Sequence, residues 1–414
     1  MSACPDPGAT SAPPPGPQSG PQPGPRAEID ARCMARAVAL ARLGRPATAP
    51  NPCVGAVLAD ETGRILAEGW HERFGQPHAE RNCLAQARER GVDPSQATLY
   101  VTLEPCNHHG KTPPCTDAVL AARIPRVVVG CADPNPAAQG GPDRLRAAGV
   151  EVVVGVLEDD CRELIEDFTL WKSSDLPFVT LKLAATLDGR IAPRLGRRQA
   201  VSGPASFADV QRLRAATQAV LVGGGTLTLD DPSLTRRAPT GKPADGQPDD
   251  HPDDQPLAVV VTGSLPGPDS DLTLLTRRAD QTVLLTGEAA AASALTRPLT
   301  ARGVRVWGLP AAPGGPDGPG RGLDLRAGLA RLRADLGVHR VLCEGGGRLA
   351  TSLLDAGLVH EFILYLAPRI LGDDSATPLA TGRACPDMAQ ALGFTIRRVS
   401  RSGEDLKIEL RPRA

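Results

Sequence analysis

The sequence predicts an α/β protein made of two domains, each with a sheet between helical layers. The chain has 414 residues, more than one ordinary hydrophobic core holds. Short apolar runs with strand character alternate with segments of helical periodicity, which is typical of α/β layers. This alternation falls into two series, 29–157 and 176–414, and a helical segment at 158–175 is expected to connect them.

The first series follows a tail, residues 1–26, made almost wholly of Pro, Gly, Ser, Ala and Gln, which we expect to be disordered. Apolar residues between 29 and 44 then recur at helical spacing. The remaining elements are expected in this order: a hairpin of strands 54–58 and 65–67 turned at 60–63, helix 78–90, strand 97–103, helix 116–123, strand 127–130, a helix or loop at 140–149, and a third buried strand at 152–154.

The second series has the same alternating character after a connecting helix at 159–171. We expect, in order, strand 178–183, helix 204–216, strands 219–223, 257–262, 281–285 and 304–307, helix 323–336, strand 338–343, helix 347–356 and strand 360–367. Two stretches rich in Pro, Gly and Asp, 236–256 and 310–320, are expected to be an exposed insertion and a loop.

Composition narrows the functional classes. The formal net charge is −1, so no global basic field would hold nucleic acid. The 10 cysteines show no disulfide-like rhythm, which favours a reducing compartment. The chain has no apolar run of membrane-spanning length and no secretory signal pattern. We therefore expect a cytoplasmic protein with neither a nucleic-acid nor a membrane partner.

Three potential zinc ligands and one free carboxylate are the strongest chemical signal in the chain. His78-Ala79-Glu80 offers an imidazole and a carboxylate, and Pro105-Cys106 and Cys115 offer two thiolates. Three protein ligands leave an open position, which marks catalytic rather than structural zinc. We expect His78, Cys106 and Cys115 to bind one zinc ion that activates water, and Glu80 to move protons as general acid and base. Both cysteines are expected at or near helix starts, which favour thiolates.

An H-x-E motif with a downstream P-C-x-x-C is typical of zinc deaminases. Here eight residues separate Cys106 from Cys115, so the generic spacing fails. The alternative interpretation is a buried histidine with incidental cysteines.

The motifs that flank the candidate zinc ligands indicate a particular family of deaminases. They are Pro50-Asn51-Pro52-Cys53-Val54-Gly55, Gly69-Trp70-His71, Pro77-His78-Ala79-Glu80, Thr102-Leu103-Glu104-Pro105-Cys106 through Thr112-Pro113-Pro114-Cys115, and Asp133-Pro134-Asn135-Pro136. In this order they resemble the deaminase half of the bifunctional riboflavin-biosynthesis deaminase–reductases, whose own zinc motif has the longer cysteine loop. The resemblance implies a cytidine-deaminase-like fold and hydrolytic removal of the 2-amino group from a diaminopyrimidine that carries phosphoribosylamine.

The same resemblance implies further site residues. Asn51 and His71 would hold the pyrimidine, with a turn residue and a surface imidazole as the alternatives. His109, Lys111 and Thr112 would line the mouth, although Lys111 could simply be solvated. Asp133 and Asn135 would define the ribose-phosphate side. One departure is that Gly140-Gly141-Pro142 has proline where the family usually has a second glycine.

In the second series, Glu344-Gly345-Gly346-Gly347 links a strand to a helix, as in loops that bind phosphate. The match to a Rossmann fingerprint is weak, because this loop stands at the end of its domain. Leu181 to Arg190, Thr226 to Thr235, Glu344 to Gly346, and Leu366 to Pro368 with Leu371-Gly372 resemble the reductase half of the same family. The resemblance implies a dihydrofolate-reductase-like fold that uses NADPH.

Carried over by position, the cofactor contacts would be Ala184, Thr226, Asp230, Gly346, Gly347, Arg348, Leu349, Ala350, Thr351 and Ser352. The substrate contacts would be Arg198, Arg214, Leu234, Arg237 and Glu344, and Lys182 and Asp188 are possible polar partners. Three positions depart from the family: Arg198 and Gly263 replace serines and Ala200 replaces a tryptophan. Arg198 could serve a phosphate or belong to an ordinary basic turn.

The resemblance therefore implies a homo-oligomeric two-site enzyme, in which zinc-dependent deamination is followed by NADPH reduction of the ribosyl group to give 5-amino-6-(5-phosphoribitylamino)uracil. One alternative is a deaminase, or a metal-dependent nucleotide sensor, with a degenerate or redirected reductase domain. Another is a nucleic-acid base deaminase, although aromatic residues make up only 3% of the chain.

Overall fold

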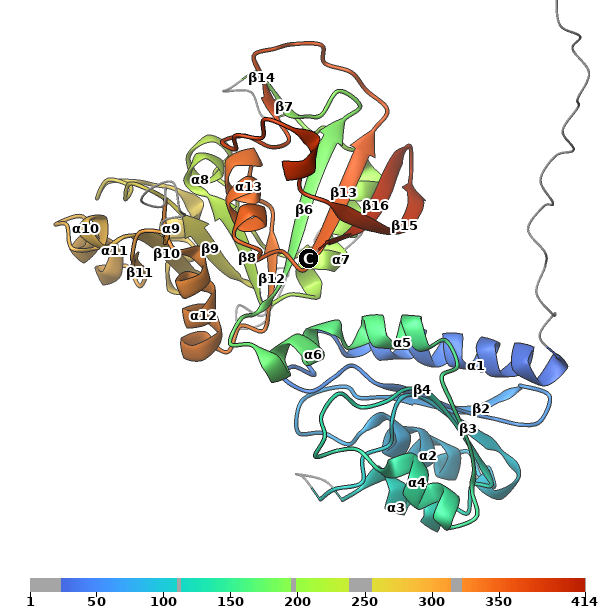
Figure 1. The fold of residues 1–414 in the computed structure, drawn as a ribbon. Coiled ribbons are helices and arrows are strands. Elements are labelled where there is room, and N and C mark those ends of the chain that lie inside the picture. Colours follow the sequence, from blue (N-terminus) through green and yellow to red (C-terminus); the bar gives the residue numbers. More distant parts are fainter. Residues whose placement is uncertain (1–23, 110–112, 195–198, 238–254, 314–321, 414) are drawn as a thin grey trace, which may run out of the picture.

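The computed structural model describes residues 24–109, 113–194, 199–237, 255–313 and 322–413. It contains one five-stranded and one nine-stranded sheet, each with helices packed against it, and the two domains stack with the connecting helices between them (Figure 1). The α/β prediction for both domains is thereby confirmed. Within the described residues, every helix is too short or too polar to cross a bilayer.

The N-terminal sheet has the order β2-β1-β3-β4-β5, with β1 antiparallel to both neighbours and β3, β4 and β5 parallel. Its elements are α1 (Pro25–Ala41), β1 (Gly55–Ala59), β2 (Ile65–Trp70), α2 (Ala79–Glu89), β3 (Thr98–Leu103), α3 (Cys115–Ala121), β4 (Arg126–Cys131), α4 (Gly141–Ala147) and β5 (Glu151–Val154), with short 3-10 turns at Arg42–Gly44 and Pro94–Gln96. One apolar core joins α1 to the sheet, and a second joins α2 to α4 to the opposite face. The carboxyl ends of β3 and β4 therefore lie on the same side of the domain as the starts of α2 and α3.

The C-terminal sheet has the order β11-β10-β9-β8-β12-β6-β13-β16-β15 and is parallel except for its final hairpin. Its strands are β6 (Phe178–Thr186), β8 (Ala219–Gly223), β9 (Leu257–Val261), β10 (Thr282–Gly287), β11 (Arg305–Leu309), β12 (Arg340–Cys343), β13 (Glu361–Ala367), β15 (Phe394–Ser402) and β16 (Asp405–Pro412). The helices are α7 (Pro204–Ala215), α8 (Gly224–Asp230), α9 (Thr273–Thr276), α10 (Glu288–Ala291), α11 (Thr296–Ala301), α12 (Leu325–Leu336) and α13 (Gly347–Asp355). A small separate sheet pairs β7 (Arg190–Arg194) with β14 (Ala376–Pro378), and 3-10 turns occur at Ala279–Gln281 and Met388–Gln390.

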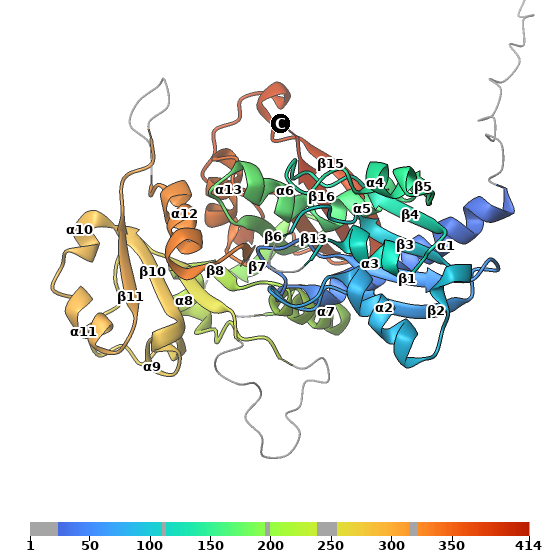
Figure 2. The ribbon, with the colours of Figure 1, turned by 90° about the horizontal axis from the view of Figure 1, so that it is seen from below.

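The connecting segment forms two helices, α5 (Glu158–Leu164) and α6 (Glu166–Ser173). Their apolar side chains complete the core above the N-terminal sheet, and the helices lie between the two domains (Figures 1 and 2). The Trp171 indole N–H donates to the carbonyl of His339 at 3.0 Å, and Arg411 lies 2.7 Å from Glu166. Thus α6 is a structural part of both domains.

Several boundaries differ from the sequence prediction. The first helix begins at Pro25 rather than near Ile29, because Gly24 caps it and proline suits a first helical turn. The predicted single connecting helix is interrupted at Ile165. Strand β5 is a partly exposed edge strand rather than a buried one. Strand β7, α8 and the β15–β16 hairpin were not predicted, and most of the 236–256 insertion and of the 310–320 loop lies outside the described residues.

Candidate active sites

The three predicted zinc ligands converge in the N-terminal domain. His78 caps α2, Cys115 is the first residue of α3, and Cys106 lies in the loop after β3. The Nδ1 atom of His78 lies 3.6 Å from the Cys106 sulfur and 3.4 Å from the Cys115 sulfur, and all three ligand atoms lie within 4.8 Å of one another. Tetrahedral zinc with ordinary Zn–S and Zn–N bonds places its ligands about 3.5 Å apart. The donor set and its spacing therefore fit zinc.

Local hydrogen bonds hold the two cysteines together. Cys106 is not at a helix start, contrary to the prediction, because β3 continues directly into its loop. Its sulfur instead accepts the backbone N–H of Cys115 at 3.3 Å. Arg81 on α2 donates to the carbonyls of Pro113 and Pro114 at 3.1 Å each, which fastens the segment before α3. The long cysteine loop thus brings both sulfurs to the same point.

Proton sharing also favours a thiolate at this point. Hydrogen bonding from Cys115, together with His78, lowers the pKa of Cys106 to about 4. The pKa of Cys115 is raised, because it shares its proton with Cys106 and is buried. The hydrogen bond to Cys106 raises the pKa of His78. Cys106 is therefore the thiolate of the two cysteines, and Cys115 is a thiol whose proton a bound metal would displace.

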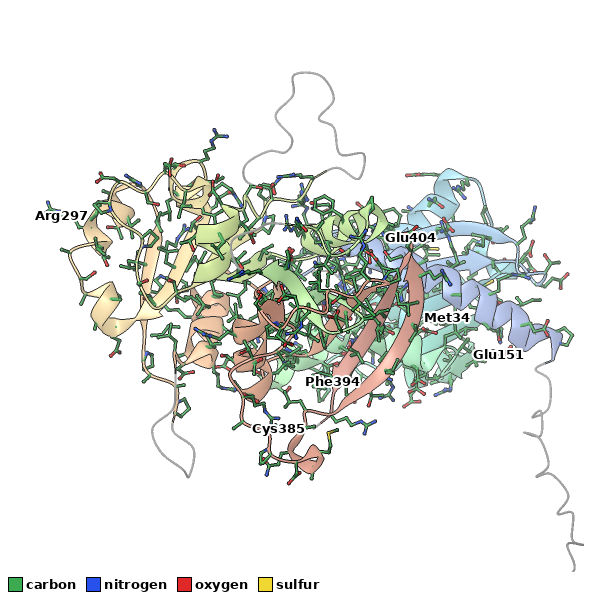
Figure 3. All side chains as sticks on the ribbon, turned by 90° about the horizontal axis from the view of Figure 1, so that it is seen from above. Met34, Glu151, Arg297, Cys385, Phe394 and Glu404 are labelled. Carbon is green, nitrogen blue, oxygen red and sulfur yellow. The ribbon has the colours of Figure 1, made fainter. Side chains whose placement is uncertain are left out.

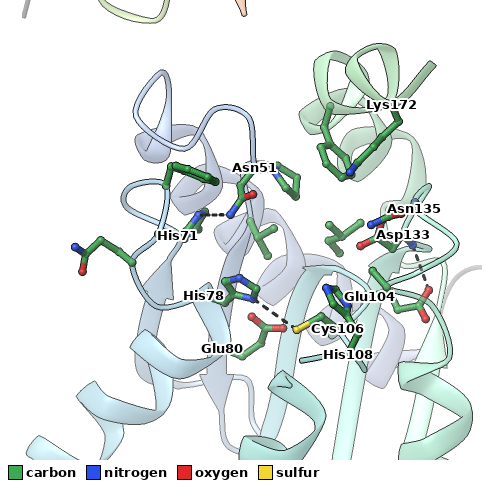
Figure 4. Close-up of a pocket in the computed structure, with 18 residues that line it drawn as sticks. Asn51, His71, His78, Glu80, Glu104, Cys106, His108, Asp133, Asn135 and Lys172 are labelled. Carbon is green, nitrogen blue, oxygen red and sulfur yellow. Dashed lines mark hydrogen bonds between the residues drawn. The ribbon is translucent and has the colours of Figure 1, made fainter. Parts of the chain in front are cut away.

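Glu80 lies beside these ligands in the first turn of α2, as Figure 4 shows. Its side chain is 3% exposed, and burial raises the pKa of its carboxyl. A raised pKa makes the carboxyl a better proton acceptor, as a general base must be.

A cavity of about 290 Å³ opens above Glu80 and His78 and also contains Asn51, Asp133 and Asn135 (Figure 4). Its wall includes His71, which is 2% exposed, so the surface-imidazole alternative is wrong. His71 Nδ1 lies 3.1 Å from the carbonyl of Pro77, and its Nε2 lies 3.2 Å from the Asn51 amide. Because a carbonyl can only accept, Nδ1 carries the proton and Nε2 accepts from Asn51. Burial lowers the pKa of His71, which keeps it neutral.

Glu104 also lines the pocket, and no role was predicted for it. Its carboxylate accepts the backbone N–H groups of Asp133 at 3.2 Å, Gly140 at 2.7 Å and Gly141 at 3.1 Å. It therefore ties the Asp133 loop to the start of α4. Pro142 falls in the first turn of α4, where its missing N–H costs nothing, so the family departure is accommodated.

Two other lining residues, Phe168 and Lys172, come from α6. The only signal that could have found them is helical spacing on the connecting segment. Lys111 and Thr112, expected at the mouth, lie outside the described residues, and His109 is exposed beside them.

The second site lies where β12 ends and α13 begins. Two expected substrate residues meet there: Arg214 on α7 contacts both carboxylate oxygens of Glu344, at 2.6 and 3.2 Å. Arg214 also donates to the carbonyl of Thr235 at 2.8 Å. The neighbouring Lys182 on β6 has its pKa lowered by burial, which Glu344 opposes. The site therefore places a guanidinium and an amine beside one carboxylate.

The expected cofactor segment forms the start of α13. Gly346 caps the helix, and a Cβ on Gly347 would lie 2.7 Å from the Pro378 carbonyl, which explains the glycine. The side chains of Leu349, Ala350 and Thr351 are buried. The backbone N–H groups of the first turn are thus the groups this segment can offer to a ligand.

The other expected residues are more scattered. Ala184 lies on β6, and Thr226 and Asp230 lie on α8. Leu234 is 2% exposed with a φ of 53°, so its side chain belongs to the core. Arg237 is exposed and donates its backbone N–H to Gln211 at 2.8 Å.

Among the departures, Ala200 and Gly263 are exposed, and Arg198 lies outside the described residues. Asp188 accepts the Thr186 hydroxyl and the N–H groups of Leu371 and Gly372, so it has a turn-forming role.

Comparisons with known proteins agree with both sites. Residues 27–131 match the cytidine and deoxycytidylate deaminase zinc-binding region, and residues 177–408 match the RibD C-terminal domain. The riboflavin biosynthesis protein RibD of Aquifex aeolicus is 38% identical over 92% of this chain and 98% of its own. RibD of Escherichia coli is 36% identical over 91% of this chain and 98% of its own.

Solved structures give the same result. Acinetobacter baumannii RibD, form 1, has a TM-score of 0.72 at 32% identity, covering 94% of this chain and 100% of that structure. A Thermotoga maritima protein described as a diaminohydroxyphosphoribosylaminopyrimidine deaminase/5-amino-6-(5-phosphoribosylamino)uracil reductase has a TM-score of 0.73 at 33% identity, covering 93% and 99%. The chain therefore belongs to the RibD family of riboflavin-biosynthesis enzymes, which join a zinc-binding deaminase domain to a reductase domain.

Proposed function

We propose that this enzyme deaminates 2,5-diamino-6-(5-phosphoribosylamino)pyrimidin-4-one and then reduces its ribosyl group to ribityl with NADPH. The observation that carries the proposal is the convergence of His78, Cys106 and Cys115 beside buried Glu80, in a pocket that also contains Asn51 and His71. The Thermotoga maritima relative is named for the same two reactions.

In the deaminase site, His78 Nδ1 and the two sulfurs would hold one zinc ion. Zinc with three protein ligands keeps an open position and lowers the pKa of water there toward ~7. Glu80 would accept a proton from the attacking water and deliver it to a ring nitrogen. It would then take the second proton from the new hydroxyl, which becomes the carbonyl, and pass that proton to the departing amino group. Neutral His71 and the Asn51 amide would orient the pyrimidine through hydrogen bonds.

In the reductase site, NADPH would supply a hydride to C1 of the opened ribosyl imine. The backbone N–H groups at the start of α13, together with Ala184 on β6 and with Thr226 and Asp230 on α8, would bind the dinucleotide. Arg214 and Glu344 would hold the substrate, and their mutual pairing fixes both side chains in position. The protein supplies no nucleophile in this step; its role is positioning.

The test is to incubate the purified, zinc-loaded enzyme with the diaminopyrimidine substrate while following ammonia release and NADPH oxidation together. Ammonia release followed by NADPH oxidation supports both halves. Ammonia release alone supports the second candidate, a deaminase with a redirected reductase domain, which the departures at Arg198, Ala200 and Gly263 favour. Absence of ammonia would refute the deaminase proposal.

We also propose that the enzyme is a homo-oligomer. The β15–β16 hairpin lies at an open sheet edge, with Phe394 and Glu404 near its ends in Figure 3. Ile396 and Val399 on β15 are 62% and 55% exposed, which is unusual for a monomer's edge strand. Light scattering of the full chain should give at least twice the 43.1 kDa monomer mass, and replacing Ile396 with lysine should lower it.

A further inference from the structure

The deaminase pocket contains three acidic side chains but very little positive charge. Glu80, Glu104 and Asp133 all line it, and Lys172 is the sole lysine or arginine among the described residues that do. A substrate carrying a phosphate needs a cation at its phosphate end, because carboxylates repel a dianion. Lys172 is therefore the one permanently charged cation among the described side chains of the wall, which otherwise offers only the imidazoles of His71, His78 and His108.

Lys172 is accessible at the mouth of the pocket and available to a ligand. Its ammonium lies 5.1 Å from the centroid of the Phe168 ring, one turn earlier on α6. Within the described part of the chain, it forms no ion pair with a carboxylate. Its charge nevertheless acts on the pocket, because it opposes the burial that raises the pKa of Asp133.

Lys172 lies on the far side of the pocket from the candidate zinc ligands. Figure 4 shows His78 and Glu80 at one end, Asp133 and Asn135 farther along, and Lys172 beyond them at the opposite end. A pyrimidine that reacts beside Glu80 would direct its ribose toward Asp133, whose carboxylate can accept ribose hydroxyls. The phosphate would then extend toward Lys172.

We propose that Lys172 binds the phosphate of the deaminase substrate and so selects phosphorylated over unphosphorylated pyrimidines. The inference rests on the deaminase activity proposed above and adds a residue that determines specificity. Asp133 and Asn135 were expected on the ribose-phosphate side of the substrate. With Lys172 at the phosphate, these two residues would contact the ribose.

If Lys172 binds the phosphate, the geometry of the phosphate subsite depends on the contacts between the two domains. Trp171, the residue before Lys172, donates to the His339 carbonyl of the reductase domain, and Arg333 donates to the Trp171 carbonyl at 3.0 Å. The position of Lys172 is thus fixed from the reductase side. Tests must use the full chain.

The experiment compares Lys172→Met with wild type, using the substrate and its dephosphorylated form. Loss of a charge-assisted contact should raise KM for the phosphorylated substrate about 10-fold or more, with kcat nearly unchanged. KM for the dephosphorylated form should not change, and Lys172→Arg should restore most of the discrimination. Arg88→Met, which removes an exposed charge on α2 away from the pocket, is the matched control.

Two further measurements keep the outcomes distinct. Unchanged NADPH oxidation in Lys172→Met, with the deaminated substrate, shows that the α6 interface is intact. Equal KM changes for both pyrimidines, or none, would overturn the role of Lys172. If wild type releases no ammonia from either pyrimidine, the proposed activity fails. Titration with ribose 5-phosphate still tests the subsite: Lys172→Met should bind it about 10-fold more weakly than wild type, and equal affinity refutes the subsite.

Discussion

The carboxylate of Asp167 on α6 and the guanidinium of Arg340 on β12 form a buried ion pair between the connecting helix and the reductase sheet. Arg45, from the deaminase domain, approaches the same carboxylate at 3.7 Å. Burial opposes the ionisation of Asp167, but the two arginines outweigh it and hold the pKa of Asp167 below its usual value. One carboxylate therefore joins all three parts of the chain.

Replacing Asp167 with Asn should strongly destabilise the enzyme. The change leaves the buried Arg340 charge and the partly buried Arg45 charge without the carboxylate that pairs with both, and breaking a buried pair in this way costs about 3–5 kcal/mol. Chemical denaturation of the full chain measures the loss. Asp175→Asn is the control, because Asp175 and Arg326 form an exposed pair at 3.7 Å and should contribute less than about 1 kcal/mol. Similar small effects of both changes would show that the Asp167 cluster does not support the interface.

Replacing Glu80 with Ala should abolish deamination and leave reduction intact. The variant loses the group that moves protons, so ammonia release should fall by about 10²–10⁴-fold or more. NADPH oxidation, measured with the deaminated substrate, should match wild type, since Glu80 lies in the other domain. Loss of both activities would mean that the two sites are not separable. Zinc content serves as the check that the fold and the ligands survive.

Replacing Cys115 with Ser should remove zinc. Wild type should contain one zinc ion per chain by atomic absorption, and the variant far less, because a serine hydroxyl is a poor ligand for this metal. Ammonia release should disappear with the metal, and NADPH oxidation should persist. Cys385→Ser is the matched control, since Cys385 is an exposed free cysteine. Stoichiometric zinc in Cys115→Ser would remove this residue from the ligand set.

The deaminase centre was more predictable from sequence than the rest of the site. His78 and Glu80 stand two residues apart at a helix start, so local geometry alone brings them to one place. The role of Glu104 depends on long-range hydrogen bonds to Gly140 and Gly141, which no local pattern indicates. Lys172 was missed for a similar reason: its place at the pocket depends on how α6 packs.

The strands buried on both faces were also predictable, because runs such as Val127 to Val129 have no other stable environment. The β15–β16 hairpin was not, since Ile396, Arg398 and Val399 are exposed and show no clean alternation between an apolar and a polar face. Helix α8 was not predicted, because its sequence, with two glycines and two threonines, has low helix propensity. Tertiary packing of Leu227 overrides that propensity.

A buried histidine should make the stability of the reductase domain depend on pH. His360 stacks on Phe178 and accepts the backbone N–H of Val179 at 3.0 Å, which requires an unprotonated Nδ1. Burial lowers its pKa to about 4, and Arg340 and Arg411 add to the shift. Below the unfolded-state pKa of about 6.5, the imidazole is therefore protonated in the unfolded chain but not in the folded one. The free energy of unfolding decreases as the pH is lowered through this range.

The size of this effect follows from the two pKa values. Above about pH 7, His360 should contribute no pH dependence to the free energy of unfolding. At pH 5 it should lower that free energy by about 2 kcal/mol, because its imidazole is almost fully protonated in the unfolded chain at this pH. In His360→Asn, the amide oxygen can still accept from Val179 but does not titrate. The difference in unfolding free energy between pH 7 and pH 5, from urea denaturation, should therefore shrink by about that amount. Identical pH dependence in the two proteins would mean that His360 can take up a proton in the folded state, in which case the Val179 hydrogen bond must break without unfolding the sheet.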